Sequence, residues 1–321
     1  MKLGLCASLY LDSSLNDVFN FAKKMGIEGL EIYSGGGGKS RHIDVDELLE
    51  SDKALESYLD QFKKRGSAIS TLNCAGNPIH PVKEKAEADH RGFERTVLLC
   101  EKMKMDKLVV FSGAPGGCPQ DKTPNWIVCP WPDEYLEARK YQWEEVLVPY
   151  WTRAVAFARE HGVTKLAFEM HPGFCVYNPE TLLMLRERVG PEIGANFDPS
   201  HLMWQGIDPG LAILELKGAV FSVHAKDVFV NHDFIVRNGP NDAKHYSDSL
   251  KRAWTFRTVG YGHSEETWRG IISALGSIGY DGFLNIEHED LYFSRQEGVT
   301  KAAEFLRGII IKEKPEGMWW A

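Results

Sequence analysis

The sequence has little that would direct the chain to nucleic acid, to a membrane or to a disulfide-stapled fold. Its 45 aspartates and glutamates outnumber 37 lysines and arginines, so the formal charge is −8 and no basic surface for a phosphate backbone is expected. No apolar run approaches the roughly 18 residues that a membrane-spanning helix needs. The N-terminal MKLGLCASLYLDSS has too short an apolar core for a signal peptide, and the six cysteines form no Cys-x-x-Cys pair. We therefore expect a cytoplasmic protein with reduced thiols.

A complete nucleotide-binding loop is also missing. The stretch SGGGGKS resembles a P-loop, but a P-loop that ends at Lys39 and Ser40 requires glycine at position 33, where the sequence has Tyr33. No Gly-x-Gly-x-x-Gly stands between a predicted strand and a predicted helix. The glycines therefore need an explanation other than a nucleotide cradle.

Short β-rich runs alternate with amphipathic helical patterns along the whole chain. Residues 15–26, 54–66 and 268–282, for example, repeat apolar side chains at helical spacing. Eight strand–helix units in roughly 300 residues favour a closed (β/α)8 TIM barrel, in one domain spanning residues 1–321, over an open doubly wound sheet. The strands are expected at residues 2–8, 28–34, 68–74, 107–113, 165–170, 193–198, 220–225 and 283–289.

Two connections are longer than the two to six residues that are usual between such elements. They are residues 114–143, after the fourth strand, and residues 226–265, after the seventh. Both follow the carboxyl ends of strands, where barrel enzymes build their active sites, so we expect long lid loops. The glycine loop follows the second strand and lies on the same rim, where Lys39, Arg41 or His42 could meet a substrate.

Polar residues stand at the ends of the last four predicted strands. They are Glu169, Asp198, His224 and Glu287. A single buried acid could be a salt-bridge partner or a cap, but four such residues on four successive strands converge in a closed barrel. Three carboxylates and one imidazole suit Mn²⁺ first, with Mg²⁺, Co²⁺ or Zn²⁺ as alternatives. The sequence therefore predicts one divalent metal site.

The motifs around these residues resemble those of the xylose isomerase-like TIM barrels, the sugar phosphate isomerase and epimerase superfamily. The resemblance rests on EMH in the fifth strand, FDPSH in the sixth, HAKD in the seventh and IEHED in the eighth. It implies that Glu169, Asp198, His224 and Glu287 hold the metal, and that Glu169 and Glu287 exchange protons with the substrate. The implied activity is that of a sugar isomerase or epimerase that removes a proton α to a carbonyl through an enediolate.

His171 makes a second reaction possible. It lies two residues after Glu169, so both side chains point the same way if the strand continues. It could cap the following Pro-Gly turn or act as a general base. The Glu-x-His pair is similar to that of C-glycoside deglycosidase catalytic subunits, which implies a lyase that eliminates a β-substituent from 3-keto-glycosides, with a small β-subunit as partner.

Further candidates surround this set. Aromatic side chains of the fourth-strand loop could stack on a sugar or fill an interface. Lys226 and Asp227 could orient His224 or touch substrate, with a plain surface pair as the alternative. The residues predicted to bind substrate are His201, Lys226, Arg257, Asn73 and His80, and the loop tryptophans are Trp126, Trp131 and Trp143.

Two other functions remain as alternatives. An endonuclease IV-like nuclease belongs to the same superfamily, but it needs extra histidines that the segment FSGAPGG does not offer. A barrel without activity could serve as an assembly subunit, although all four predicted ligands are present. We expect a metal-dependent enzyme for a small sugar or keto-glycoside, forming a homo-oligomer, with no nucleic-acid or membrane partner.

Overall fold

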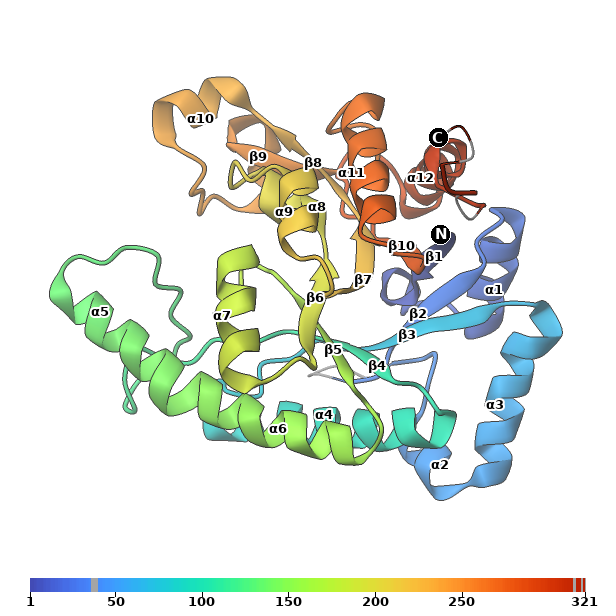
Figure 1. Cartoon of the computed structure of the whole chain (residues 1–321), viewed down its shortest axis with the longest axis horizontal. Coiled ribbons are helices and arrows are strands. Elements are labelled where there is room, and N and C mark those ends of the chain that lie inside the picture. Colours follow the sequence, from blue (N-terminus) through green and yellow to red (C-terminus); the bar gives the residue numbers. More distant parts are fainter. Residues whose placement is uncertain (36–39, 314–315, 319, 321) are drawn as a thin grey trace.

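A closed parallel barrel forms the centre of the molecule. The computed structural model describes residues 1–35, 40–313, 316–318 and 320. Eight strands pair in the order β1-β10-β7-β6-β5-β4-β3-β2, and helices surround them (Figure 1). The predicted TIM barrel is confirmed, and each predicted strand segment contains one barrel strand. These strands are β1 (Lys2–Cys6), β2 (Gly29–Tyr33), β3 (Ala68–Cys74), β4 (Lys107–Val110), β5 (Lys165–Glu169), β6 (Ile193–Phe197), β7 (Val220–Ala225) and β10 (Phe283–Ile286).

The outer helices follow local sequence signals. Ser14 caps the first turn of α1 with its side chain, and the helix buries Val18, Phe19 and Ala22. α3 ends at Arg65 and is capped by Gly66, whose φ of 63° suits glycine. The α-helices are α1 (Leu15–Lys24), α2 (Val45–Glu50), α3 (Asp52–Arg65), α4 (Lys83–Met103), α5 (Asp133–Lys140), α6 (Val148–Glu160), α7 (Pro179–Val189), α8 (Pro199–Met203), α9 (Pro209–Glu215), α10 (His232–Asn238), α11 (Glu265–Ser277) and α12 (Arg295–Ile309).

The core lies between the barrel and these helices. Trp151 and Trp268 on the helices and Phe168 and Phe197 on the strands are among its largest fully buried side chains. Such aromatic side chains supply much of the apolar area that folding removes from water. Among the described residues, no helix has the length and apolarity to cross a membrane.

The strand register places polar side chains at one level of the barrel interior. His224 of β7 stands opposite Asn285 of β10, and Glu169 of β5 stands opposite Asn196 of β6. Gly4 of β1 lets the backbone approach closely here, because a Cβ atom at that position would collide with Oδ1 of Asn285. The backbone pairing therefore brings charged and amide side chains together before any ligand is considered.

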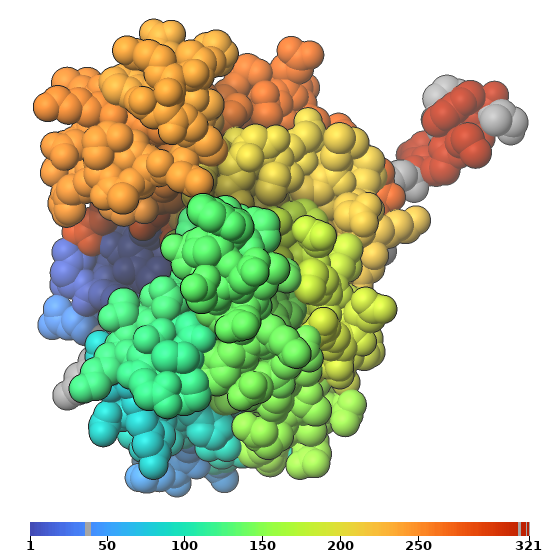
Figure 2. All heavy atoms as spheres, turned by 90° about the vertical axis from the view of Figure 1, so that its left-hand side faces the viewer, coloured from blue at the N-terminus to red at the C-terminus, as the bar shows by residue number. Residues whose placement is uncertain are grey.

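The two long connections lie on one side of the molecule (Figures 1 and 2). After β4 the chain runs into α5, which has no buried residue, and then into a π-helical segment, Tyr141–Leu147. After β7 it forms an antiparallel pair of strands, β8 (Asp227–Val230) and β9 (Trp254–Arg257), with α10 and a 3-10 helix, Tyr246–Lys251, between them. The second connection is thus a small structured insertion, whereas the sequence predicted a loop. Its strands have four residues each, too few for a clear periodic pattern.

Candidate metal and catalytic centre

The four predicted metal ligands meet at the carboxyl ends of four barrel strands. Glu169 ends β5 and His224 lies within β7, while Asp198 and Glu287 directly follow β6 and β10. One ligand atom from each side chain lies within 4.8 Å of the other three. We call these four residues the ligand cluster. Strand closure has brought together side chains that are far apart in the sequence.

Several atoms of the ligand cluster are buried without a hydrogen bond. Within the described residues, Asp198 Oδ2, His224 Nδ1 and Glu287 Oε2 have no hydrogen-bond partner. His224 Nδ1 lies 3.2 Å from Glu169 Oε2 and 3.1 Å from Glu287 Oε2. Asp198 Oδ2 and Glu287 Oε2 also form ion pairs with Lys226. A divalent cation at this point would give all three atoms a direct ligand bond. Because the set is rich in oxygen with one imidazole, it fits Mn²⁺, Mg²⁺ or Co²⁺ and also accommodates Zn²⁺.

The two glutamates of the cluster are held in their charged form. Burial opposes the ionisation of Glu169, but the neighbouring side chains of His201 and His224 outweigh it and keep the pKa of Glu169 well below its usual value. Burial opposes the ionisation of Glu287 as well, yet the charge of Lys226 and the contact with His224 lower its pKa to about 2. Both side chains are therefore carboxylates at neutral pH, which is the form that binds a metal.

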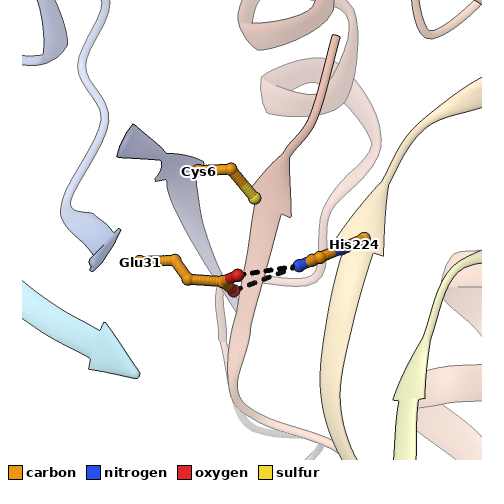
Figure 3. Close-up of side chains that lie close together, drawn as sticks. All are labelled: Cys6, Glu31 and His224. Atoms are coloured by element: carbon orange, nitrogen blue, oxygen red, sulfur yellow. Dashed lines mark hydrogen bonds and ion pairs between the residues drawn. The ribbon is translucent and has the colours of Figure 1, made fainter. Parts of the chain in front are cut away.

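Glu31 of β2 contacts the other edge of the His224 ring (Figure 3). His224 Nε2 lies 3.1 Å from both carboxylate oxygens, and the amides of Asn73 and Asn285 donate to the same carboxylate at 2.6 and 3.1 Å. Because an ionised carboxylate can only accept, this contact keeps a proton on Nε2 and reserves Nδ1 for a cation. Sequence reasoning gave Glu31 no role, although an acid inside the apolar run GLEIY was a usable signal.

Cys6 of β1 completes a second buried group with Glu31 and His224 (Figure 3). Burial raises the pKa of the Cys6 thiol, so the sulfur carries its proton. The Glu31 carboxylate is already engaged by two amide donors and the imidazole. We therefore interpret this group as the support of His224 and not as a second cation site.

Replacing Glu31 with glutamine is expected to weaken Mn²⁺ binding about 10- to 100-fold, the range typical for losing a partner that orients a metal-binding histidine. Isothermal titration calorimetry of the metal-free protein measures this change. Glu28→Gln is the matched control, because Glu28 is an exposed acid just before the same strand. Equal affinities for the wild type and Glu31→Gln would contradict the role of Glu31.

Lys226, predicted to touch substrate or orient His224, is buried inside the centre. Its Nζ atom lies 3.2 Å from Asp198 Oδ2 and 3.1 Å from both Glu287 Oε2 and Glu289 Oε2. Burial on its own would lower the pKa of Lys226, but the charges of Asp198, Glu287 and Glu289 raise it well above its usual value. The ammonium group thus neutralises part of the acidic cluster, and the surface-pair alternative does not apply.

His171 and His201 stand side by side next to Glu169. Their ring centroids are 4.2 Å apart, and each ring offers a nitrogen within 4.8 Å of a Glu169 oxygen. His201 is buried, with Nε2 3.2 Å from Glu169 Oε1 and 3.5 Å from Asp198 Oδ2. Phe111 and Phe174 pack against the edges of the His171 ring. Both histidines therefore lie at the rim of the ligand cluster.

Asp227 does not contact His224 but ties the insertion to the barrel. Asp227 Oδ2 accepts hydrogen bonds from the backbone amides of Gly260, Gly262 and His263 and from the indole of Trp268, at 3.0 to 3.2 Å. The carboxylate is fully buried. The expectation that Asp227 orients His224 is replaced by a structural role.

Asp227→Asn is expected to lower the free energy of unfolding by about 3 kcal/mol, because the amide nitrogen cannot accept these buried N–H groups. Urea unfolding followed by circular dichroism measures the loss. Asp233→Asn, an exposed change in the first turn of α10, should stay within about 0.5 kcal/mol of the wild type. If Asp227→Asn also stayed within about 0.5 kcal/mol of the wild type, the hydrogen bonds to the Asp227 carboxylate would not be important for stability.

The remaining predicted substrate residues fall in different places. Asn73 lies at the centre through its bond to Glu31, and its Oδ1 accepts from the amide of Ala75. Arg257 forms a salt bridge with Asp290 at 3.1 Å, which is the structural alternative. His80 accepts a hydrogen bond from the Val82 amide and lines a separate cavity that includes neither histidine of the centre. The structure does not bring His80 to the cluster.

Of the three glycine-loop residues that could meet a substrate, the structure describes Arg41 and His42. Lys39 lies outside the described residues, as do three of the glycines. Arg41 donates to the backbone oxygen of Asp12, and His42 Nε2 contacts that of Ser13, so both hold the segment after β1.

The three tryptophans of the fourth-strand connection have different surroundings. Trp143 is buried in helix packing, whereas Trp131 is 76% exposed. Trp126 lines a cavity together with His171 and His201. Of the three, Trp126 is therefore placed to meet a ligand.

Two adjoining cavities open beside His171. One has a volume of about 400 Å³ and mixed walls, in which His288, Glu289 and Arg295 stand beside apolar side chains such as Leu291 and Phe293. The other has about 360 Å³ and largely aromatic walls. Both are lined by His171, Tyr246 and Phe256. Volumes of this size are typical of small-molecule sites.

Comparison with known proteins agrees with this architecture. The chain is 38% identical to the uncharacterized protein YfiH of Bacillus subtilis over 313 residues, which cover 97% of this chain and 99% of YfiH. Among solved structures it resembles the "probable 3-DHS dehydratase AsbF" of Bacillus anthracis, with a TM-score of 0.65, 18% identity and coverage of 96% and 99%.

Two further solved structures resemble the chain at similar distance. A D-tagatose 3-epimerase-like protein has a TM-score of 0.61 and 17% identity, and the match covers 96% of this chain and 98% of that protein. The IOLI protein, solved with a bound zinc atom, has a TM-score of 0.64 and 17% identity, and the match covers 97% of this chain and 98% of IOLI. These identities are low, so the structural likenesses show the fold. The model of the xylose isomerase-like TIM barrel family matches residues 19–309, and the chain belongs to that family.

Proposed function

We propose that this protein is a divalent-metal-dependent enzyme that removes a proton from the carbon beside the ketone of a sugar or related polyol, as an isomerase or epimerase. The observation that carries the proposal is the convergence of three carboxylates and one imidazole at one point of the barrel rim. The epimerase-like and zinc-containing relatives by fold support the same class.

The ligand cluster would hold the cation through Glu169, Asp198, His224 and Glu287. When bound, a divalent cation polarises a carbonyl oxygen and stabilises the negative charge that develops as the neighbouring proton leaves. Glu31 keeps His224 in the required tautomer, and Lys226 offsets the remaining negative charge. In the isomerase or epimerase reaction, Glu169 and Glu287 would be the pair that exchanges a proton with the substrate.

His171 is the proposed general base. Its Nδ1 lies 2.6 Å from the backbone oxygen of Pro172, which can only accept, so Nδ1 carries the proton and Nε2 has the free lone pair. Burial and the neighbouring His201 lower the pKa of His171 to about 3, so the ring is neutral at physiological pH. A neutral imidazole at the edge of both cavities can take a proton from a substrate that fills them.

A second candidate reaction is β-elimination, which the position of His171 favours. After His171 removes the α-proton, the electron pair of the C–H bond forms a carbon–carbon double bond. The β-substituent then leaves with its bonding electrons and takes a proton from an acid. The name of the dehydratase relative describes the elimination of water and supports this alternative.

Incubating the Mn²⁺-loaded protein in D₂O with ketohexoses, inososes and 3-keto-glucosides, followed by NMR, tests the proposal. We expect deuterium at one carbon next to the carbonyl. An epimer or a shifted carbonyl would then indicate the isomerase class, and an unsaturated product with a released substituent would indicate elimination. Neither exchange nor product across the panel would contradict the proposed function.

A further inference from the structure

The cavity beside His171 and His201 has largely aromatic walls. Aromatic rings from three separate parts of the chain meet there. These are Trp126 after β4, Trp204 after α8, and Tyr246, Trp254 and Phe256 of the insertion. We call this space the aromatic cavity. Figure 2 shows that the fourth-strand connection, in green, and the insertion, in orange, lie on the same face of the molecule.

The rings of the aromatic cavity are held flat and in place. Trp204 and Trp254 stack with centroids 4.6 Å apart and planes inclined by 9°. The guanidinium of Arg252 lies 4.5 Å from the ring centroids of both Tyr246 and Trp254. Because Arg252 is itself buried, it fixes these two rings before any ligand binds. Preordered flat walls favour a flat ligand, since little conformational entropy is lost on binding.

Within the described part of the chain, two of the three indole groups of the cavity make no hydrogen bond, whereas Trp254 donates to the backbone oxygen of Pro240. The Nε1 atoms of Trp126 and Trp204 are buried and have no acceptor among the described residues. By contrast, Trp151 and Trp268 in the core donate to Ser112 and Asp227. Because the Nε1 atoms of Trp126 and Trp204 are not exposed on the cavity wall, the rings offer a ligand their apolar surfaces and not their N–H groups.

The second cavity has more charged side chains in its walls, and it shares His171, Tyr246 and Phe256 with the aromatic cavity. Its lining includes His288, Glu289, Asp290 and Arg295, which suit hydroxyl groups. His171 lies on the boundary, because it lines both cavities. A substrate that spans the boundary would place its polyol part beside these charged groups and a flat part against the aromatic walls.

We propose that the substrate is a sugar or polyol that carries a flat, aromatic ring substituent, and that this ring occupies the aromatic cavity. The proposal rests on the proposed function for the assignment of His171 to the reacting carbon. The occupation of the cavity by the ring depends only on the walls described above.

Binding of two simple probes tests the inference. Calorimetry on the Mn²⁺-loaded protein compares phenyl β-D-glucopyranoside with methyl β-D-glucopyranoside, which differ only in the flat ring. We expect the phenyl glycoside to bind at least about tenfold tighter, in line with the stacking contribution of aromatic walls. Equal affinities, or no binding of the phenyl probe up to its solubility limit, would overturn the proposal.

Variants of the cavity walls show where the phenyl ring of the probe binds. Trp126→Ala should remove most of the preference for the phenyl probe and leave the affinity for the methyl probe unchanged, and Trp204→Leu gives a second test from the opposite wall. Trp131→Ala is the control, because Trp131 lies on the same connection but is 76% exposed. A preference that survives both cavity variants would overturn the placement.

The probe-binding test and the deuterium-exchange test can fail independently of each other. A phenyl preference that depends on Trp126, without deuterium exchange on any keto-sugar, would support the aromatic cavity and contradict the chemistry. Exchange on free keto-sugars without a phenyl preference would support the chemistry and overturn the aromatic substituent.

Discussion

Glu169→Gln and Asp198→Asn should each lose the bound metal, with Mn²⁺ affinity reduced by more than about 100-fold, beyond the range for an outer partner. Each change removes a negative charge and one oxygen lone-pair site from the ligand cluster while keeping the size of the side chain. Asparagine at position 198 can still cap α8 by accepting the Ser200 amide, so the local fold should persist. Metal content after gel filtration, measured by inductively coupled plasma mass spectrometry, gives the result directly.

Glu192→Gln is the matched control for these variants. Glu192 is a buried acid that pairs with Arg159 at 3.1 Å, just before the start of β6, and so lies at the opposite end of the barrel. Its replacement should leave the metal content unchanged. Full occupancy and activity in both Glu169→Gln and Asp198→Asn would contradict the metal site.

His171→Ala should keep the metal but reduce deuterium exchange at the substrate carbon by about 10²- to 10⁴-fold, the usual contribution of a general base. His171 is not in the ligand cluster, and its Nε2 has the free lone pair required for proton abstraction. The metal content and the exchange rate, measured on the same sample, separate these two effects.

The control for His171 is His161→Ala. His161 ends α6 and pairs with Glu101 on the outside of the barrel, so neither metal content nor exchange should change. Exchange at the wild-type rate in His171→Ala would remove its role as the base and leave the proton transfer to Glu169 and Glu287.

The barrel and its ligand cluster could be predicted because both follow from local patterns. Each barrel strand is a short apolar run between helical segments, and closure of a parallel barrel brings all carboxyl ends to one rim. Polar residues at those ends, such as Asp198 and Glu287, could therefore be expected to meet. This inference needed only the topology.

The contacts of Glu31 and Asp227 were harder to predict, because they join parts of the chain that are far apart in the sequence. Glu31 reaches His224 from a strand that is not its neighbour in the sheet, so no spacing in the sequence links them. Asp227 looks like a partner of His224 in HAKD but turns to the amides of the segment after β9.

The aromatic cavity was not predicted for a similar reason. Its walls come from the fourth-strand connection, from the residue after α8 and from the insertion. The insertion looked like a loop, because β8 and β9 are too short for a periodic signal. His80 shows the opposite case. It was expected to line the centre because it is close in sequence to Asn73, but it caps a turn.

Anomalous diffraction from crystals grown with Mn²⁺ shows whether a cation binds at the ligand cluster. We expect one strong peak per chain, within bonding distance of Glu169, Asp198, His224 Nδ1 and Glu287, with Glu31 still hydrogen-bonded to His224 Nε2. The absence of a peak among these four residues, or a peak at Cys6, Glu31 and His224 Nε2 instead, would contradict the proposed metal site.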